Sequence, residues 1–186
     1  MEEKLTLKKF EEASEIVKKV TLNTNLIYSD YFSDQTGNQV YIKPENMQFT
    51  GAYKVRGSYY KISTLSDEER ERGLITASAG NHAQGVAYAA KIFGVKATVV
   101  MPTVTPLMKV NRTKSYGADV ILYGDVYDDA CNYALNLAQK DIHLFILLMT
   151  LMLRRVREQL QWKFLRNFQQ LIIFLYQSEV ADLLQV

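Results

Sequence analysis

The chain has few residues of the types that form disulfides or bind metals. Cys131 is the only cysteine, so an internal disulfide is impossible and a reducing compartment is the better fit. A zinc site usually needs four Cys or His ligands, and the whole chain holds two histidines beside that cysteine. No metal site is therefore expected.

The chain also lacks an excess of either charge. It has 22 Lys and Arg against 20 Asp and Glu, which gives a formal charge of +2. Proteins that bind nucleic acid or anionic membranes usually carry a clear basic surplus, so neither partner is expected. The N-terminal stretch "MEEKLTLKKFEEASEIVKK" has no apolar core of the signal-peptide type. The sequence thus predicts a cytoplasmic protein.

Glycine and proline are missing from the last part of the chain. All nine glycines and all three prolines precede residue 144, whereas residues 144–186 contain eleven leucines and six glutamines. Turns and helix caps depend on Gly and Pro, so this tail is not expected to build a compact α/β segment. Its apolar run from Leu144 to Leu153 is shorter than the roughly 20 residues of a membrane-spanning helix. The run predicts a buried or aggregation-prone helix instead, since a tail-anchored or membrane-surface segment fits it poorly.

Before residue 144, strand and helix patterns alternate. Thr6 is suited to cap a helix that reaches about Val20, and Ser66 with Glu69 forms a capping-box pattern that closes on Gly73. Further strands are expected at 39–43, 74–79, 96–101 and 119–123, and further helices at 53–62, 81–94, 106–117 and 127–140. Such alternation predicts right-handed βαβ units, hence an α/β fold with a parallel sheet and flanking helices.

The stretch "TASAGNHAQG" follows one predicted strand and opens a predicted helix. In open parallel sheets, ligands bind beyond the carboxyl ends of the strands, where helix N-termini offer free N–H groups to anions. Ser78, Gly80 and Asn81 are small or polar enough to admit a carboxylate or phosphate there. The alternative is an ordinary turn in which Asn81 only caps the helix. His82 has a similar alternative, as a structural hydrogen-bonding residue.

Lys54 stands in the stretch "MQFTGAYKVRGSYYKI", with Gly51 and Gly57 on its two sides. A lysine at a helix start is usually a solvated surface charge. A catalytic amine instead needs a partly buried setting that lowers its pKa. The glycines would allow another backbone to come close, and neighbouring tyrosines would shield the amine from water. Composition and spacing leave both readings open.

Three stretches in order carry a family resemblance. The segments "KPENMQFTGAYKVRG", "TASAGNHAQGVAYAA" and "MPTVTPLMKVNRTKSYGADVILYGD" resemble the threonine dehydratase (threonine ammonia-lyase) group of pyridoxal-phosphate enzymes. The resemblance covers roughly Lys4 to Lys140. It implies part of a tryptophan-synthase-β-like fold, called fold type II, and an enzyme that uses pyridoxal 5'-phosphate.

The resemblance also implies roles for single residues. Lys54 would form the Schiff base with the cofactor, and Asn81 would hydrogen-bond the ring oxygen of the cofactor. The loop Ser78–Ala79–Gly80–Asn81–His82 would hold the substrate carboxylate. The implied reaction is the β-elimination of L-threonine, and of L-serine, to 2-oxobutanoate or pyruvate and ammonia, in isoleucine biosynthesis or threonine catabolism. Full-length relatives are expected to be homo-oligomers.

The family pattern stops near residue 143. Members continue with a His-Pro-Phe-Asp stretch, a Gly-Gln-Gly-Thr motif and a glycine run that grips the cofactor phosphate. When the tail is back-translated and read from the third base of each codon, residues 144–152, 155–164 and 177–182 can encode these three motifs in order. We therefore interpret 1–143 as the N-terminal part of a dehydratase catalytic domain and 144–186 as an out-of-frame tail, the alternative being a genuine divergent extension.

A chain without the glycine run should bind the cofactor weakly. Without the later strands of the domain, the sheet would keep an exposed edge and an uncovered apolar face, so the chain should tend to aggregate. Other enzymes of the same fold, such as serine racemase, cysteine synthase and threonine synthase, are the alternatives within the family. An alternative of another class is a non-catalytic remnant, or a small-anion binding module that uses the helix start at Asn81.

Overall fold

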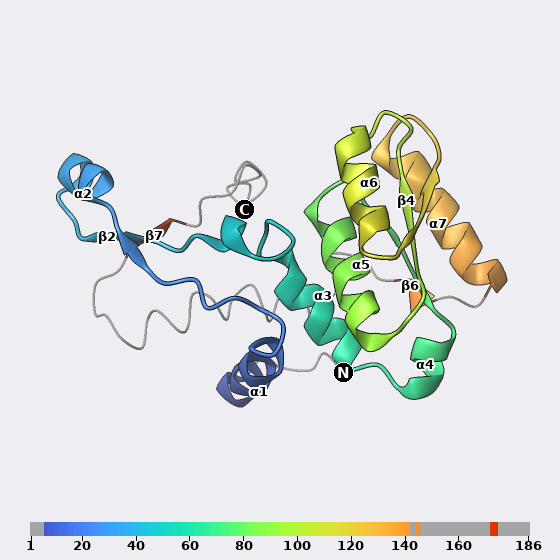
Figure 1. Ribbon diagram of the computed structural model, residues 1–186, viewed down its shortest axis with the longest axis horizontal. Coiled ribbons are helices and arrows are strands. Elements are labelled where there is room, and N and C mark those ends of the chain that lie inside the picture. Colours follow the sequence, from blue (N-terminus) through green and yellow to red (C-terminus); the bar gives the residue numbers. More distant parts are fainter. Residues whose placement is uncertain (1–5, 142–143, 146–171, 175–186) are drawn as a thin grey trace.

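The computed structural model describes residues 6–141, 144–145 and 172–174. In Figure 1, a sheet with helices on its faces lies at one end of the molecule, and the strand β2 with the short helix α2 lies at the other. The helix α3 (Lys54–Ser63) lies between them. The candidate site residues lie at the start of α3 and between strand β3 (Leu74–Ala77) and the helix that follows it.

The larger sheet is parallel throughout. Its strands are β3 (Leu74–Ala77), β4 (Ala97–Met101), β5 (Asp119–Leu122) and β6 (Leu144–Phe145), in the spatial order β5-β4-β3-β6. Leu74 pairs with Ala97 on one side and with Leu144 on the other. The predicted strands at 74–79, 96–101 and 119–123 are confirmed, and so is the parallel α/β class.

Helices cover both faces of this sheet. On one face lie α5 (Asn81–Phe93) and α6 (Leu107–Ser115), and on the other lies α7 (Tyr127–Asp141). Side chains of β4 alternate between the two cores, since Val99 packs with Val86 of α5 whereas Val100 packs with Ala130 of α7. Full burial of one such valine or leucine stabilises the fold by about 1.5–3 kcal/mol.

The first helix of the chain packs on α3. The helix α1 (Leu7–Val17) is capped by Thr6, whose Oγ1 accepts a hydrogen bond from Lys9 N at 3.4 Å. Val17 packs against Tyr60 of α3. The short helix α4 (Asp67–Glu71) has the predicted capping box between Ser66 and Glu69. The helix at residues 6–20 is thus confirmed, although it ends at Val17.

The other end of the molecule holds elements that the sequence analysis mostly missed. The predicted strand at 39–43 is β2 (Val40–Ile42), which pairs antiparallel with β1 (Ile27–Tyr28) and parallel with β7 (Ile172–Phe174). Between β1 and β2 lies α2 (Asp30–Thr36), which begins at the cap Ser29 and ends at Gly37 with φ +67°. A 3₁₀ turn, η1 (Glu45–Met47), then leads towards α3.

One predicted helix is wrong where the structure describes it. The run from Leu144 to Leu153 was expected to be helical, but Leu144 and Phe145 form β6 beside Leu74 and Ile75. The edge of β3 offers unpaired backbone N–H and C=O groups. A segment that lies along this edge in an extended conformation pairs its own backbone groups there, whatever its local helix preference. Residues 146–153 lie outside the described part of the chain. Within that part, no helix has the length and apolar character that crossing a membrane requires.

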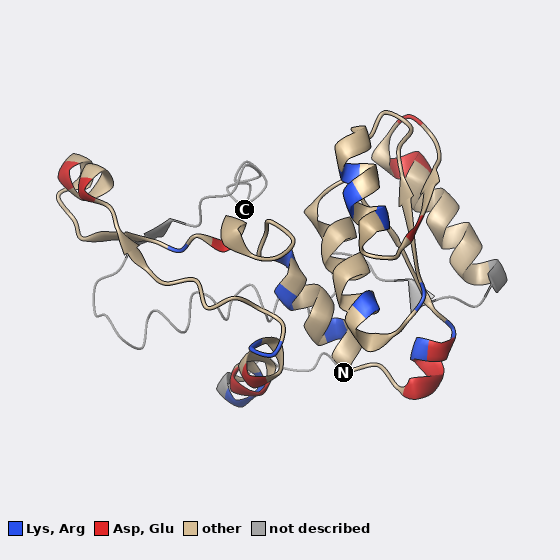
Figure 2. Cartoon of the chain, in the orientation of Figure 1, with Lys and Arg blue, Asp and Glu red and all other residues tan. Residues whose placement is uncertain are grey.

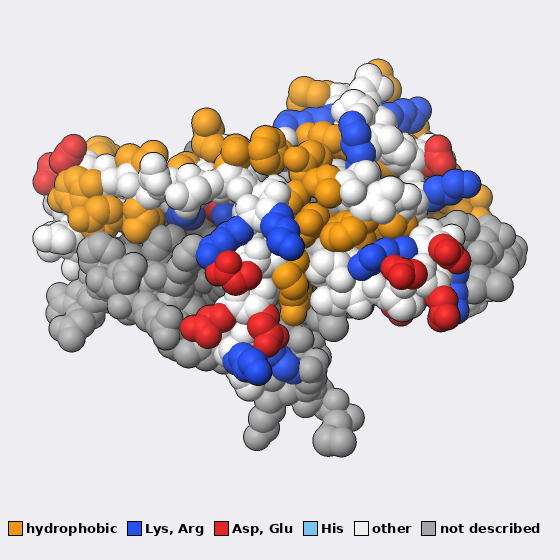
Figure 3. Space-filling model, turned by 60° about the horizontal axis from the view of Figure 1, so that its bottom comes forward, with side chains coloured by type: hydrophobic (Ala, Val, Ile, Leu, Met, Phe, Trp, Pro, Cys, Tyr) orange, Lys and Arg blue, Asp and Glu red, His pale blue; other side chains and the backbone are white. Residues whose placement is uncertain are grey.

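Several large apolar side chains are exposed, and Figure 3 shows such side chains spread over one face. At the start of α6, Val104, Leu107 and Met108 are 72%, 72% and 76% exposed. Phe49 and Met47, which precede α3, are also exposed. Exposed apolar side chains favour association between molecules, and the predicted tendency to aggregate stays a prediction.

Candidate active site

Lys54 is the first residue of α3 and is partly buried. The turn before it is tight, with Gly51 at φ +71° and Thr50 Oγ1 donating to the carbonyl of Ala52 at 3.4 Å. A left-handed backbone of this kind favours glycine. The turn therefore brings the chain abruptly into α3 at Lys54.

The predicted carboxylate loop lies between β3 and α5. Ser78 N continues the strand pairing by donating to the carbonyl of Val100 at 3.0 Å, and Ser78 Oγ accepts from Gly80 N at 3.2 Å. Gly80 occupies the N-cap position, and no described side chain caps this end. The first N–H groups of α5 have no acceptor within the helix, and the helix dipole adds about half a positive charge there. This end of α5 suits a carboxylate or phosphate.

The structure groups all five loop residues at the start of α5. Ser78, Ala79, Gly80 and Asn81 are partly buried, whereas His82 is buried with 3% of its surface exposed. Asn81 is the first helical residue, because Gly80 takes the cap. Gly80, and not Asn81, thus holds the cap position that the alternative reading gave to Asn81, and whether the turn binds a ligand stays a prediction.

The helices that carry the two motifs pack directly on each other at Gly85. A Cβ atom built on Gly85 would lie 3.2 Å from the carbonyl carbon and oxygen of Lys54 and 2.9 Å from Ser58 Oγ. Gly85 is about one helical turn beyond Asn81. The absence of a side chain at Gly85 thus lets the start of α3 approach the first turns of α5.

From the sequence, this close approach was expected at Gly51 and Gly57. Gly51 instead faces the guanidinium of Arg112, whose nitrogens would lie 3.7 Å from an added Cβ. Gly85 was missed, although a glycine inside a helical pattern is a signal of close packing.

Helix α5 packs against two helices that carry basic residues. Its neighbours α3 and α6 carry lysines and arginines, and α3, α5 and α6 contain no acidic residue. Figure 2 shows the basic residues along these helices, whereas α1 and α4 mix both signs. The absence of acidic side chains in the three helices lowers the electrostatic cost of placing an anion beside them.

The loop before Lys54 is tied to α5 and α6 through Phe49. The carbonyl of Phe49 accepts from Tyr116 Oη at 3.1 Å and from Arg112 Nη2 at 3.4 Å. Its ring stacks on Tyr88 with 5.7 Å between centroids, and Tyr88 meets Tyr116 edge-on at 5.4 Å. Burial, and next the nearby Tyr116, raise the pKa of Tyr88, so this phenol stays neutral. The loop is therefore anchored on the side of α5.

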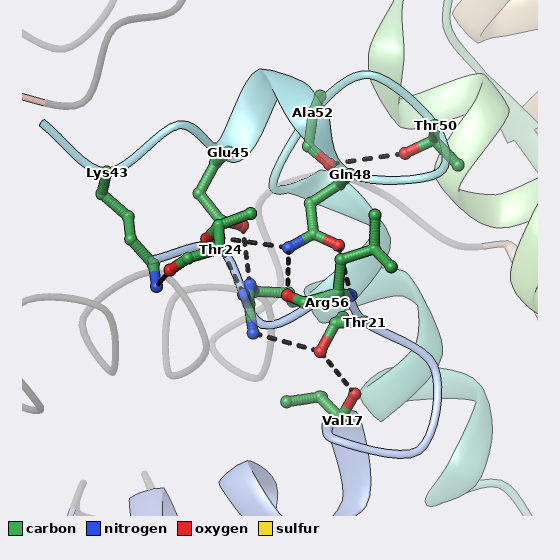
Figure 4. A network of polar contacts seen from close by, with 10 residues as sticks. Val17, Thr21, Thr24, Lys43, Glu45, Gln48, Thr50, Ala52 and Arg56 are labelled. Carbon is green, nitrogen blue, oxygen red and sulfur yellow. Dashed lines mark hydrogen bonds and ion pairs between the residues drawn. The ribbon is translucent and has the colours of Figure 1, made fainter. Parts of the chain in front are cut away.

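A buried ion pair lies on the other side of the same loop (Figure 4). Arg56 donates from Nε to Glu45 Oε2 and from Nη2 to Glu45 Oε1, both at 2.8 Å. The side chains are 12% and 4% exposed. Burial by itself raises the pKa of Glu45, but the hydrogen bonds and charge of Arg56, with hydrogen bonds from Thr24 and Gln48, outweigh it. The pKa of Glu45 therefore lies below its usual value.

Gln48 extends this network to the segment that follows α1. It accepts from Leu22 N and donates to Leu22 O, both at 2.9 Å, and it also donates to Glu45 at 3.3 Å. Thr24 Oγ1 donates to Glu45 Oε1 at 2.8 Å. No role was predicted from the sequence for Glu45, Gln48 or Arg56. Their burial would have been the signal, and only tertiary contacts reveal it.

The described residues fit pyridoxal phosphate in part. They supply an amine at the start of α3, an open helix N-terminus beside it and a glycine contact that holds the two helices close. The glycine run that the family uses for the cofactor phosphate is absent from the sequence as it stands. Among the described residues, no group of three or more His, Cys, Asp or Glu side chains is arranged to hold a metal ion.

Comparison with known proteins agrees with this arrangement. Residues 17–150 match the family described as "Pyridoxal-phosphate dependent enzyme". The chain is 49% identical over 142 residues to an L-threonine ammonia-lyase of Thermotoga maritima, which covers 76% of this chain and 35% of that protein. It is 49% identical over 138 residues to a catabolic L-threonine dehydratase, TdcB, of Staphylococcus aureus, covering 74% of this chain and 40% of that protein. The chain thus spans less than half the length of these relatives.

Solved structures show the same fold. The processed threonine deaminase isoform 2 of Solanum lycopersicum aligns with a TM-score of 0.79 at 34% identity, over 88% of this chain and 50% of that one. A maize serine racemase aligns with a TM-score of 0.82 at 25% identity, over the same shares. The predicted fold type is confirmed.

Proposed function

Because the chain belongs to the family of pyridoxal-phosphate-dependent enzymes, we propose that it carries the first part of an L-threonine ammonia-lyase. The reaction would convert L-threonine to 2-oxobutanoate and ammonia, and L-serine to pyruvate and ammonia. Water leaves in the elimination and is taken up again in the final hydrolysis, so the net loss from the amino acid is ammonia. The proposed setting is amino-acid metabolism in the cytoplasm.

When bound, pyridoxal phosphate supplies the electron sink that makes the α-hydrogen of an amino acid acidic. The Lys54 amine would hold the cofactor and, once released, accept the α-proton at Nζ. The N-terminus of α5, with Ser78 to His82, would bind the substrate carboxylate through backbone N–H groups. Asn81 would orient the cofactor by a hydrogen bond to its ring oxygen.

One observation carries this proposal: the contact between Gly85 and the backbone of Lys54. It places the start of the lysine-bearing helix against the helix whose free N-terminus suits a carboxylate. An amine that acts on an amino acid must lie close to the group that anchors that amino acid. This contact between two motifs that are separate in the sequence supports the proposal.

Serine racemase is a second candidate, because the maize enzyme gives the higher of the two TM-scores. The same amine and carboxylate site would serve it, but the α-carbon would be reprotonated instead of losing its β-hydroxyl. A non-catalytic remnant is the candidate of another class. It would follow if 1–143 is the dehydratase part and 144–186 an out-of-frame tail, as the codon reading proposes.

The experiment is to trap the cofactor on the chain. The Lys54 amine would condense with the aldehyde of pyridoxal phosphate with loss of water, and borohydride would reduce the carbon–nitrogen double bond to a stable secondary amine. Mass spectrometry of peptides then locates the adduct. We expect Lys54 to carry most of it, added L-threonine to lower it, and Lys54→Ala to abolish that site. An even spread over all lysines that L-threonine does not change would contradict the proposal.

Activity separates the two enzyme candidates. In a chain whose reading frame is restored after residue 143, a lyase would form 2-oxobutanoate from L-threonine. A racemase would form D-serine from L-serine. The unaltered chain, with residues 144–186 as they stand, would form neither product if it is the non-catalytic remnant.

A further inference from the structure

The proposed chemistry does not use the buried Glu45–Arg56 ion pair, although Arg56 is two residues from Lys54. Two charges buried at 4% and 12% exposure are costly to desolvate, so such pairs are weak evidence of a contribution to stability. A pair of this kind is often explained better by the geometry that it imposes.

The pair acts on the side of α3 away from Lys54. Successive residues of an α-helix are about 100° apart around the axis, so Arg56 lies about 200° from Lys54. The guanidinium meets both carboxylate oxygens of Glu45 at 2.8 Å. A planar two-point contact restrains rotation as well as distance. It therefore limits how α3 can turn about its own axis.

The partner of Arg56 is itself held in place. Glu45 begins the turn η1, and its Oε1 also accepts from Thr24 and from Gln48. Gln48 in turn makes two hydrogen bonds to the main chain of Leu22. Figure 4 shows the resulting network, which joins the segment after α1, the turn η1 and helix α3. A carboxylate fixed from several sides is a firm anchor for α3.

On its opposite side, the first turn of α3 lies against Gly85 of α5. The N-cap residue of α3, Tyr53, makes no side-chain cap hydrogen bond. The direction of the first turn is thus determined by the ion pair on one side and by α5 on the other.

We infer that the Glu45–Arg56 pair is a positioning device for Lys54: it holds the rotation of α3 so that the Lys54 amine is presented to the start of α5. Glu45 and Arg56 act through Lys54 and touch neither cofactor nor substrate. This inference rests on the proposed function, since it takes Lys54 to be the cofactor-binding amine.

The test distinguishes an effect on the position of the Lys54 amine from an effect on folding stability. Removing one partner leaves a buried charge unpaired and weakens the fold, whereas removing both charges can leave stability nearly unchanged. The main variant is therefore the double change Glu45→Gln with Arg56→Met. Arg56→Lys is the second variant, because it keeps the charge and loses the planar fork. Glu12→Gln is the matched control, since it neutralises a glutamate in an exposed pair with Lys8.

Two quantities are measured on each variant of the full chain. The melting temperature from circular dichroism reports folding. The yield of borohydride-trapped phosphopyridoxyl adduct on Lys54, divided by that on the exposed Lys91, reports the presentation of the amine. A purely structural ion pair would change the first quantity and, in variants that still fold, leave the second unchanged.

We expect the Lys54-to-Lys91 ratio to fall about ten-fold in the double variant and in Arg56→Lys, since displacements of about 1 Å reduce reaction rates strongly. Glu12→Gln should match the unaltered chain in both quantities. A folded double variant with an unchanged ratio overturns the inference. If the double variant does not fold, an unchanged ratio in Arg56→Lys overturns it. If the unaltered chain shows no preference for Lys54, the proposed function falls, and the inference with it.

Discussion

Gly85 in α5 lies against the main chain of Lys54 at the start of α3. A side chain at position 85 would come within 3.2 Å of the Lys54 carbonyl and within 2.9 Å of Ser58 Oγ. Contacts this short force one helix to move, because the Lys54 atoms belong to the backbone and cannot rotate away. The spacing of α3 and α5 therefore depends on the lack of a side chain at one position.

Gly85→Ala should destabilise the protein. Alanine gains about 1 kcal/mol over glycine in a helix, but the overpacking against α3 costs about 1–3 kcal/mol. A net loss in the free energy of unfolding, measured with urea, is the expected result. Adding Ser58→Ala removes the 2.9 Å contact and should recover part of the loss. A more stable Gly85→Ala variant would show that the two helices are not in close contact.

Glu45 should make the free energy of unfolding depend on pH in the acidic range. Its pKa is lower in the folded protein than in the unfolded chain, so its contribution is complete above the ordinary carboxyl pKa of about 4.3 and is lost as the pH falls through the folded value. The free energy of unfolding of the unaltered chain should thus fall more steeply on acidification below about pH 4.3 than that of Glu45→Gln. Parallel curves for the two proteins would contradict the assignment.

At neutral pH, Glu45→Gln should cost roughly 3–5 kcal/mol, because it leaves the buried Arg56 without a counter-charge. Urea unfolding at pH 7 measures this loss. Glu12→Gln, which alters an exposed pair, should change the free energy of unfolding by less than about 1 kcal/mol. Similar losses in the two variants would mean that the Glu45 pair is solvated.

Tyr116→Phe should loosen the loop that leads to Lys54. It removes the hydroxyl that donates to the Phe49 carbonyl at 3.1 Å, a bond worth about 0.5–1.5 kcal/mol. The amide hydrogens of residues 50–54 should then exchange faster with solvent. Tyr31→Phe is the control, since Tyr31 is 69% exposed and lies on α2. Unchanged exchange in Tyr116→Phe would show that this bond does not hold the loop.

The coding DNA tests the proposed division at residue 143. If residues 144–186 are read out of frame, the DNA read from the third codon position should encode a glycine run opposite Ser178 to Ala181. Sequencing the gene gives the answer. Any other residues at those four codons would remove the support for a frameshift and favour a divergent extension.

Local patterns predicted much of the fold. The elements from β3 to α7 were expected at nearly their observed positions, because apolar spacing, the capping box at Ser66 and the glycines that end helices act within a few residues. The strand β1 and the helix α2 were missed. Ile27 and Tyr28 are 54% and 45% exposed, so β1 shows no pattern of buried residues to recognise. The strand β6 was read as a helix because its pairing with β3 joins residues far apart in the chain.

The sequence by itself, through the family resemblance of three stretches, picked out Lys54 and the loop from Ser78 to His82 as candidates, since those side chains and backbone groups have their chemistry wherever they lie. Only the tertiary structure decided how they meet. Gly85 against Lys54, and Glu45 against Arg56, are contacts between segments that a local pattern treats separately. Packing distance and burial exist only after the chain has folded, so the device that orients Lys54 cannot be read from the residues around it.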